Sequence, residues 1–70
     1  MQKTKLGQQI KDRRKELTIN QTTLAELAEV SLNTLYKIER GQSNPSLAVL
    51  TRILDVLGLE LVIRAKSVDP

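Results

Sequence analysis

The sequence predicts a mainly α-helical domain, in which a bundle of four helices is followed by one C-terminal β-strand. Apolar residues recur at helical spacing in four segments between Leu6 and Gly58. Residues that typically begin or end helices separate these segments. The last apolar stretch, Leu59–Ala65, alternates as strands do. We expect a flexible N-terminus over 1–5, a helical domain over 6–58, a dimerisation strand over 59–65 and a flexible tail over 66–70.

The composition limits which functions are open to the chain. Its 70 residues form one domain at most. It contains no cysteine and no histidine, which removes disulfides, the usual zinc ligands and the commonest general base. We therefore expect no catalytic residues, no metal and no cofactor, and we interpret Glu26, Glu29 and Asp55 as helix-surface charges. No apolar run reaches the ~20 residues that span a bilayer and no signal peptide opens the chain, so we expect a cytoplasmic protein without a membrane partner.

Basic residues are concentrated near the N-terminus of a chain whose net charge is +3. The first fifteen positions contain Lys3, Lys5, Lys11, Arg13, Arg14 and Lys15. Such a region suits an anionic partner such as a phosphate backbone. The alternative, an ordinary solvated helix face, stays open on charge alone. Tyr36 is the only aromatic residue, which leaves little basis for stacking on single-stranded nucleic acid.

The first helix is expected from Leu6 to about Leu17, because Leu6, Ile10 and Leu17 recur at helical spacing. Gly7 is a weak position early in this helix. A short connector follows, in which we expect Ile19 to pack down before the capping residue Asn20.

Two short helices, Gln21–Ala28 and Ser31–Arg40, are expected around a tight turn at Glu29-Val30. Asn20 and Ser31 can each accept a hydrogen bond from a free amide of the first helical turn. The inward faces should carry Leu24, Leu27 and Ala28 in the first of these helices, and Leu35 and Ile38 in the second.

The fourth helix is expected after Gly41, a residue type that ends helices in the left-handed conformation. Its cap is either Asn44 or Ser46, and it stops at Gly58. Its apolar set is wider than one core-facing stripe, which predicts a second surface that something covers.

These residues resemble the helix-turn-helix of phage-repressor-like (Xre/Cro-type) DNA-binding domains over roughly Leu6 to Gly58. The match runs through Gln21, Leu24-Ala25, Ala28, Val30-Ser31, Leu35, Ile38-Glu39, Arg40-Gly41 and Asn44-Pro45-Ser46. The sequence departs at Glu29, where relatives commonly have glycine because the turn requires a left-handed backbone. We expect the turn to tolerate this strain, which is on the order of 1 kcal/mol. The alternative is an αα-hairpin that only packs.

The resemblance implies that the third helix reads bases in the major groove of double-stranded DNA. Asn33 would pair with adenine and Lys37 would donate to guanine. Leu32 stands where many relatives carry a polar residue, and could contact a thymine methyl group. Tyr36 would either touch the sugar-phosphate backbone or serve as a packing residue.

Contacts to the DNA backbone are implied for Gln21, Ser31, Thr34, Arg40, Ser43 and Asn44. The alternative for Arg40 is a cation that complements the dipole of its helix without touching DNA. The resemblance also pairs Arg14 with Glu39 as an ion bridge between the first and third helices, which sequence spacing alone does not show. The alternative is two solvated charges.

The predicted strand Leu59–Ala65 has no second segment of this chain to pair with. We therefore expect it to pair antiparallel with the same strand of a second copy. The dimer contacts would be Leu59, Leu61 and Ile63 of the strand and Val49, Ile53 and Val56 of the fourth helix. A homodimer would place two reading helices about one DNA turn apart, ~34 Å, and bind a near-palindromic operator. The alternative is a disordered tail on a monomer.

The expected function is that of a sequence-specific transcriptional repressor. The short length and the LGLELVIRA tail are similar to HipB, the antitoxin of HipA/HipB-type toxin–antitoxin pairs. That likeness implies autoregulation and binding of a HipA-like kinase toxin. Two alternatives stay open, a plain Xre-family regulator without a toxin partner and a module that mainly binds another protein. An enzyme is not expected.

Overall fold

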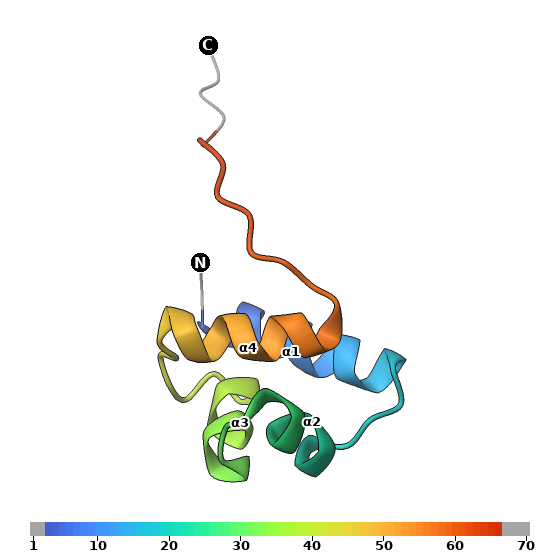
Figure 1. Cartoon of the computed structure of the whole chain (residues 1–70). Coiled ribbons are helices and arrows are strands. Elements are labelled where there is room, and N and C mark those ends of the chain that lie inside the picture. The colour runs from blue at the N-terminus through green and yellow to red at the C-terminus, as the bar shows by residue number, and fades with distance from the viewer. Residues whose placement is uncertain (1–2, 67–70) are drawn as a thin grey trace.

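Four helices form two layers in the computed structural model, which describes residues 3–66. One layer contains α1 (Lys3–Glu16) and α4 (Leu47–Leu57), which lie side by side. The other contains α2 (Gln21–Ala28) and α3 (Leu32–Glu39), as Figure 1 shows. The predicted bundle of four helices with a helix-turn-helix is confirmed.

The helix bounds are close to the expected ones. α2 has the predicted limits, whereas α1 begins at Lys3 and includes three residues that we had assigned to a flexible N-terminus. Positions 1, 2 and 67–70 of the predicted flexible ends lie outside the described residues.

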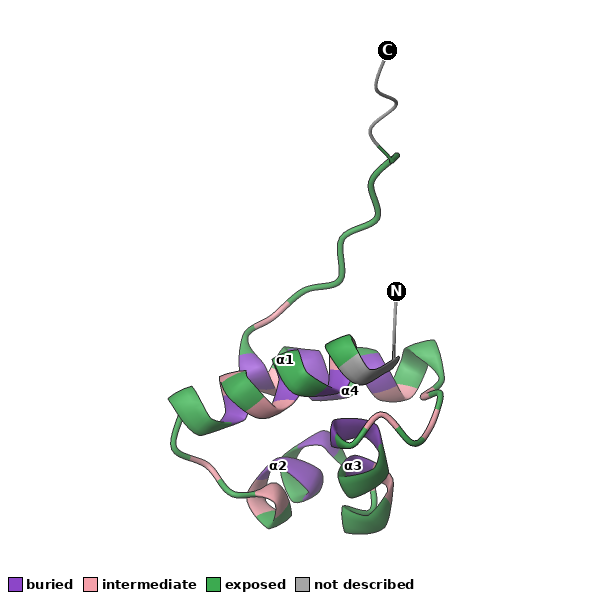
Figure 2. Ribbon diagram, turned by 180° about the vertical axis from the view of Figure 1, so that it is seen from behind, coloured by how far each residue is buried: buried purple, intermediate pink, exposed green. Residues whose placement is uncertain are grey.

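The hydrophobic core lies between the two layers and receives side chains from all four helices (Figure 2). The largest fully buried side chains are Ile10, Leu24, Leu35, Ile38, Ile53 and Leu57. The prediction for Leu27 was wrong, because this side chain is 61% exposed. The buried positions of α2 are Leu24, Ala25 and Ala28, and Leu27 lies beside that stripe rather than on it.

Hydroxyl and amide side chains begin three of the helices. Asn20 Oδ1 accepts from the Thr23 amide at 2.8 Å, and Ser31 Oγ accepts from the Thr34 amide at 3.0 Å. The open choice for α4 is settled in favour of Ser46, whose Oγ accepts from the Val49 amide at 3.2 Å. Each bond satisfies an amide that has no partner within its own helix.

The turn between α2 and α3 has the strained backbone that the sequence predicted. Glu29 adopts φ 57° and ψ 44°, in the left-handed region. The Val30 amide then donates to Ala25 O at 3.0 Å, and this bond closes the last turn of α2. Thr18, in the connector after α1, is a second non-glycine residue with a positive φ, 56°, and the sequence did not predict it.

Two arginines donate hydrogen bonds to main-chain carbonyl groups at the C-terminal ends of helices. Arg13 Nε donates to Leu57 O at 2.9 Å and so ties α1 to the end of α4. Arg52 Nε donates to Ala28 O at 3.1 Å and ties α4 to the end of α2. A cation at a helix C-terminus satisfies free carbonyl groups and complements the helix dipole.

Among residues 3–66, the structure contains no β-strand, so the strand predicted at Leu59–Ala65 is not present in the single chain. The segment leaves α4 and runs away from the helices (Figure 1). Leu59 is half-buried against the core, whereas Ile63 is 92% exposed. The assignment of Ile53 to the dimer surface was wrong, because the core fully encloses this side chain.

Candidate nucleic-acid interface

A buried ion pair fixes α3 against α1. Arg14 donates through Nε to Glu39 Oε2 at 2.7 Å and through Nη2 to Glu39 Oε1 at 3.0 Å. Both side chains are almost fully enclosed, so the bidentate geometry compensates for the loss of hydration. The hydrogen bond from Arg14 to Glu39, and then the charge attraction between them, raise the pKa of Arg14 above its ordinary value, although burial opposes this.

The same carboxylate also connects α2 to the pair. Gln21 Nε2 donates to Glu39 Oε1 at 3.0 Å, and Arg14 Nη1 donates to Ile19 O at 3.1 Å. Residues of α1 and α2 therefore meet at one buried carboxylate of α3, and Arg14 also binds the connector before α2. This network holds the start of α2 and the end of α3 in a fixed relative orientation.

The outer side of α3 carries the residues that we predicted to read bases. Leu32, Asn33, Tyr36 and Lys37 are all exposed. Gln21, Leu32, Asn33 and Tyr36 line a shallow hollow between the first turns of α2 and α3. The inward side of α3 is occupied by Leu35, Ile38 and Glu39, which are buried. The helix thus separates its packing residues from a mixed polar and apolar outer surface.

The residues predicted to contact the DNA backbone differ in their exposure. Ser31 Oγ also donates to Thr34 Oγ1 at 2.7 Å, so the two hydroxyl groups share one local network. The Arg40 guanidinium lies over the Tyr36 ring, 5.3 Å from its centroid, and both residues are exposed. In the loop before α4, Ser43 is half-buried and Asn44 is exposed.

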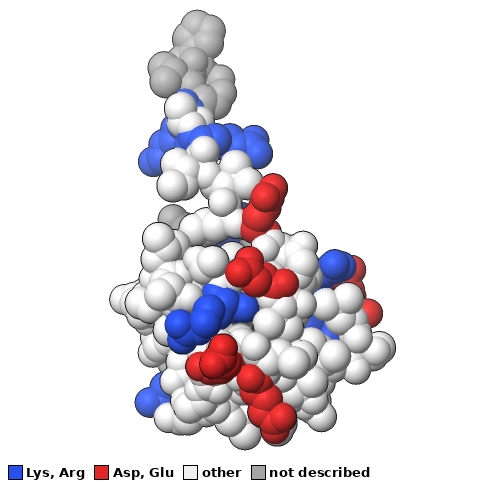
Figure 3. Space-filling model, viewed as in Figure 1, with Lys and Arg blue, Asp and Glu red and all other residues white. Residues whose placement is uncertain are grey.

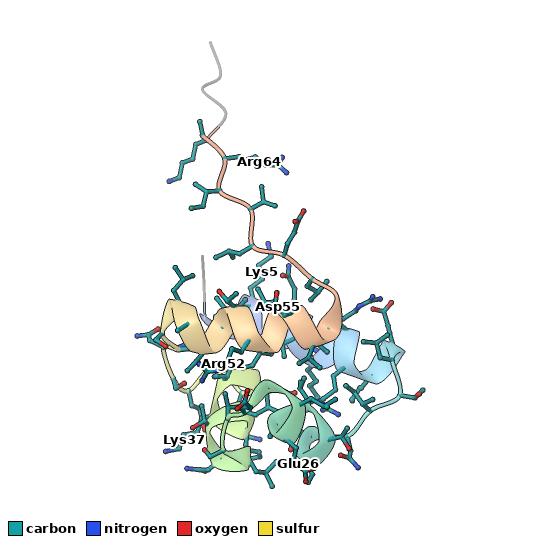
Figure 4. All side chains as sticks on the ribbon, in the orientation of Figure 1. Lys5, Glu26, Lys37, Arg52, Asp55 and Arg64 are labelled. Atoms are coloured by element: carbon teal, nitrogen blue, oxygen red, sulfur yellow. The ribbon has the colours of Figure 1, made fainter. Side chains whose placement is uncertain are left out.

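The charged side chains are of both signs on the face that includes α4. The face seen in Figure 3 carries basic and acidic side chains intermixed. Arg13 and Arg14 of the basic N-terminal group bond to Leu57 and Glu39, so these two cations serve the fold. Lys37 projects outward from α3 and Glu26 from α2, as Figure 4 shows.

Other chemistry finds little support in the described residues. Between residues 3 and 66, no group of three or more Asp or Glu side chains could hold a metal ion. No helix within that range is long and apolar enough to cross a membrane.

Sequence reasoning missed three residues that shape this site indirectly. Gly7 is buried where α1 crosses the end of α3, and it had been considered only a weak helix position. Arg13 and Arg52 bond to main-chain carbonyl groups that are 44 and 24 residues distant. Cations in a helix sequence carry no local signal for such partners, so only the fold could identify them.

Comparisons with known proteins agree with this geometry. A family model described as "Helix-turn-helix" (HTH_3) matches residues 10–63. An immunity repressor protein of Bacillus phage phi105 is 43% identical over 56 residues, which cover 80% of this chain and 39% of that protein. An uncharacterised HTH-type transcriptional regulator of Methanothermobacter thermautotrophicus is 41% identical over 51 residues, covering 73% of this chain and 74% of that protein.

One solved structure is also similar over most of its length. The restriction-modification controller protein C.AhdI from Aeromonas hydrophila superposes with a TM-score of 0.78 at 32% identity. The match covers 81% of this chain and 86% of that one. By contrast, this chain spans well under half of the phage immunity repressor.

Proposed function

The chain belongs to the helix-turn-helix family, and on that premise we propose that it is a sequence-specific, double-stranded DNA-binding transcriptional repressor. The observation that carries the proposal is the fixed, outward-facing surface of α3. Its core-facing side chains and the Arg14–Glu39 pair hold the helix, while Asn33 and Lys37 stay exposed. A short helix presented in this way fits the major groove.

Base reading would come from the first turns of α3. The Asn33 amide can both donate and accept, which matches the N6 and N7 atoms of adenine. Lys37, one turn later, can donate to guanine O6 or N7. These contacts distinguish base pairs, because each base pair presents its own pattern of donors and acceptors in the major groove.

Contacts to the DNA backbone would set the register of α3 in the groove. Gln21 lies at the start of α2, where free amides and the helix dipole favour a phosphate group. One N–H of its side-chain amide is bound to Glu39, which leaves the second N–H for a phosphate oxygen. Ser31, Thr34, Arg40, Ser43 and Asn44 are the further candidates around the same surface.

We further propose that the repressor acts as a homodimer through Leu59–Ala65. This segment is extended away from the helices and presents Val62 and Ile63 to solvent. Leu47, Leu54, Leu59, Leu61 and Ile63 line an apolar groove between α4 and the segment, together with Thr51, Asp55 and Glu60. Pairing with the same segment of a second copy would satisfy its main-chain groups and cover these apolar side chains. Two reading helices would then require a near-palindromic operator.

A more specific form of this function would be that of an antitoxin, which would also bind a kinase-like toxin as in HipA/HipB-type pairs. It rests on the likeness of the LGLELVIRA tail to that of the antitoxin. Because a second copy would already cover the exposed apolar segment, we propose a regulator that needs no toxin in order to bind its operator.

Selection of preferred sites from random duplex DNA tests the proposal. We expect an enriched near-palindromic sequence, and binding to it should fall steeply with salt as phosphate contacts release counterions. No retention of duplex DNA at low salt would refute DNA binding, whereas an affinity that does not change with salt would refute the proposed phosphate contacts. Enrichment of a single asymmetric half-site would refute the dimer alone.

A further inference from the structure

Arg13 and Arg14 are consecutive residues of α1 that bind the ends of two different helices. Arg13 Nε donates to Leu57 O at the end of α4, at 2.9 Å. Arg14 donates through two nitrogen atoms to the Glu39 carboxylate at the end of α3. Successive side chains of a helix point about 100° apart, so one turn of α1 can hold a different helix on each side. The position of α3 and the origin of the C-terminal segment are therefore tied to the same turn of α1.

The carbonyl group that Arg13 binds lies where the chain leaves α4. Gly58 follows Leu57 directly, and its left-handed backbone, with φ 69° and ψ 26°, turns the chain out of the helix. The amides of residues 58 and 59 donate back into the last turn of α4. A Cβ atom at position 58 would stand 3.6 Å from Arg13 Nη2, so the guanidinium group lies close to this exit. Because glycine is conformationally permissive, the direction of the chain here depends on such contacts.

The direction of the C-terminal segment is set where it begins. Leu59 is half-buried against the core, whereas residues 60–65 are exposed and run away from the helices (Figure 1). Resting on the proposed function and its dimer, we propose that Arg13 is a positioning residue for operator recognition. By fixing the exit at Gly58, it sets the separation and angle of the two reading helices, and thereby the spacing between the half-sites of the operator.

A small change at this exit has a large effect on the dimer. Figure 1 shows α3 in the layer opposite α4, so a rotation at Gly58 moves the two α3 helices relative to each other. One base pair inserted between half-sites moves them about 3.4 Å apart and turns them by about 34–36°. A dimer with a fixed exit therefore accepts one spacing. Arg13 is suited to fix it, because a hydrogen bond from a charged donor is stronger than one between neutral groups.

The test varies the spacing of the operator and measures dissociation constants. Each duplex carries two inverted copies of the preferred half-site, at the selected spacing or with one or two base pairs inserted or removed. The parent should bind the selected spacing at least about tenfold more tightly than its neighbours, because the misfit must be absorbed by deforming the DNA. Arg13→Met, which has a methyl group at the place of Nε, should reduce this preference to about threefold or less. Its preferred half-site sequence should not change.

Two further variants assign the effect to Arg13. Arg52→Met removes the same charge and a bond of the same kind, from Arg52 Nε to Ala28 O, but leaves the exit of α4 untouched. It should lower stability and keep the full spacing preference, which a merely structural effect would not distinguish from Arg13→Met. Arg13→Lys keeps the charge but has a methylene group where arginine has Nε, and should relax the preference. It takes the place of Arg13→Met if the methionine variant does not fold.

The outcomes separate this inference from the function on which it rests. If no duplex is retained, the DNA-binding proposal itself fails. If the parent binds half-sites without a preferred spacing, the dimer is refuted and the role of Arg13 with it. If the parent has a preferred spacing and the Arg13 variants keep it undiminished, the role of Arg13 alone is refuted. An equal relaxation in Arg52→Met would also refute it, since any loosening of α4 would then suffice.

Discussion

Gly7 of α1 lies directly against the main-chain carbonyl group of Ile38 in α3. A Cβ atom at position 7 would stand 2.9 Å from Glu39 O and still closer to Ile38 O. Both of these neighbours are main-chain atoms near the buried end of α3, so neither can move aside without moving the helix. The absence of a side chain at Gly7 is therefore what allows α1 and α3 to cross at this distance.

We predict that Gly7→Ala destabilises the domain by about 1–3 kcal/mol, the usual cost of overpacking. The change is informative because alanine is favoured over glycine inside a helix by about 1 kcal/mol, so helix propensity alone predicts the opposite sign. Thermal unfolding measures the effect, and Gln9→Ala on the exposed side of α1 is the control. A melting temperature equal to or above that of the parent would show that α1 does not need this close crossing.

The Arg14–Glu39 pair gives a second prediction. Glu39→Ala leaves a buried guanidinium without its partner and should cost about 3–5 kcal/mol. Substituting both residues with methionine should recover much of that loss, because no uncompensated charge then remains in the core. Chemical denaturation compares the variants.

Glu16→Ala is the matched control for this pair. It breaks the exposed Arg13–Glu16 pair, whose atoms are 3.8 Å apart, and should change stability by less than about 1 kcal/mol. If Glu39→Ala were as mild as Glu16→Ala, the buried pair would contribute nothing to the position of α3.

The strained turn gives a third prediction. Glu29→Gly should stabilise the fold by about 1 kcal/mol, because glycine adopts the left-handed conformation without the steric cost of a Cβ atom. Glu26→Gly, at a solvent-exposed position within α2, should destabilise the fold by a similar amount. The same substitution three residues apart should therefore have opposite signs in one thermal-unfolding series. Equal signs would mean that Glu29 carries no strain.

Some of the features behind these predictions could be predicted from the sequence, and others could not. Helix boundaries followed from local chemistry, since Asn20 and Ser31 bind amides within three residues of themselves. The left-handed turn at Glu29 followed from the family pattern. The sequence could not decide whether Asn44 or Ser46 caps α4, because both are good capping residues. Only the direction of the chain determines which amide each side chain can reach.

The remaining features depend on contacts between distant segments. In the sequence, Gly7 is only a weak helix position, whereas in the fold it allows the close approach of α1 to the end of α3. Arg52 bonds across the fold to Ala28 O, and no periodicity predicts such a bond. The Arg14–Glu39 pairing came from the family resemblance rather than from spacing. Residues 60–65 are exposed in the single chain, so the alternating pattern of Leu59–Ala65 has no neighbour among residues 3–66 to pair with.

The fourth prediction separates base reading from backbone contacts. Asn33→Ala should lose about 1–3 kcal/mol of binding on the preferred site and relax selectivity at one base pair. Gln21→Ala should weaken binding to all duplexes more evenly, because its proposed partner is a phosphate group. Site selection repeated with each variant is the measurement. Identical selectivity profiles for the two variants would refute this division of roles.

The last prediction concerns the register of the proposed strand pair. With a two-fold axis at Val62, antiparallel pairing sets Glu60 opposite Arg64 of the second copy, and Leu61 opposite its Ile63. The alternation then places Leu59, Leu61 and Ile63 on one face of the ribbon, where they could cover the groove along α4. Each dimer would contain two Glu60–Arg64 cross-strand pairs.

Charge reversal tests this register. In the proposed dimer, Glu60→Arg or Arg64→Glu alone would place like charges opposite each other in both cross-strand pairs. Cross-strand pairs contribute roughly 0.2–1 kcal/mol each, so either change should raise the dimer dissociation constant about tenfold. The doubly reversed protein, with both substitutions in one chain, restores opposite charges and should dimerise like the parent. Sedimentation equilibrium measures all four proteins. A parent that stays monomeric at concentrations where its operator is bound would refute the dimer, whereas single variants as tightly dimeric as the parent would refute only the register.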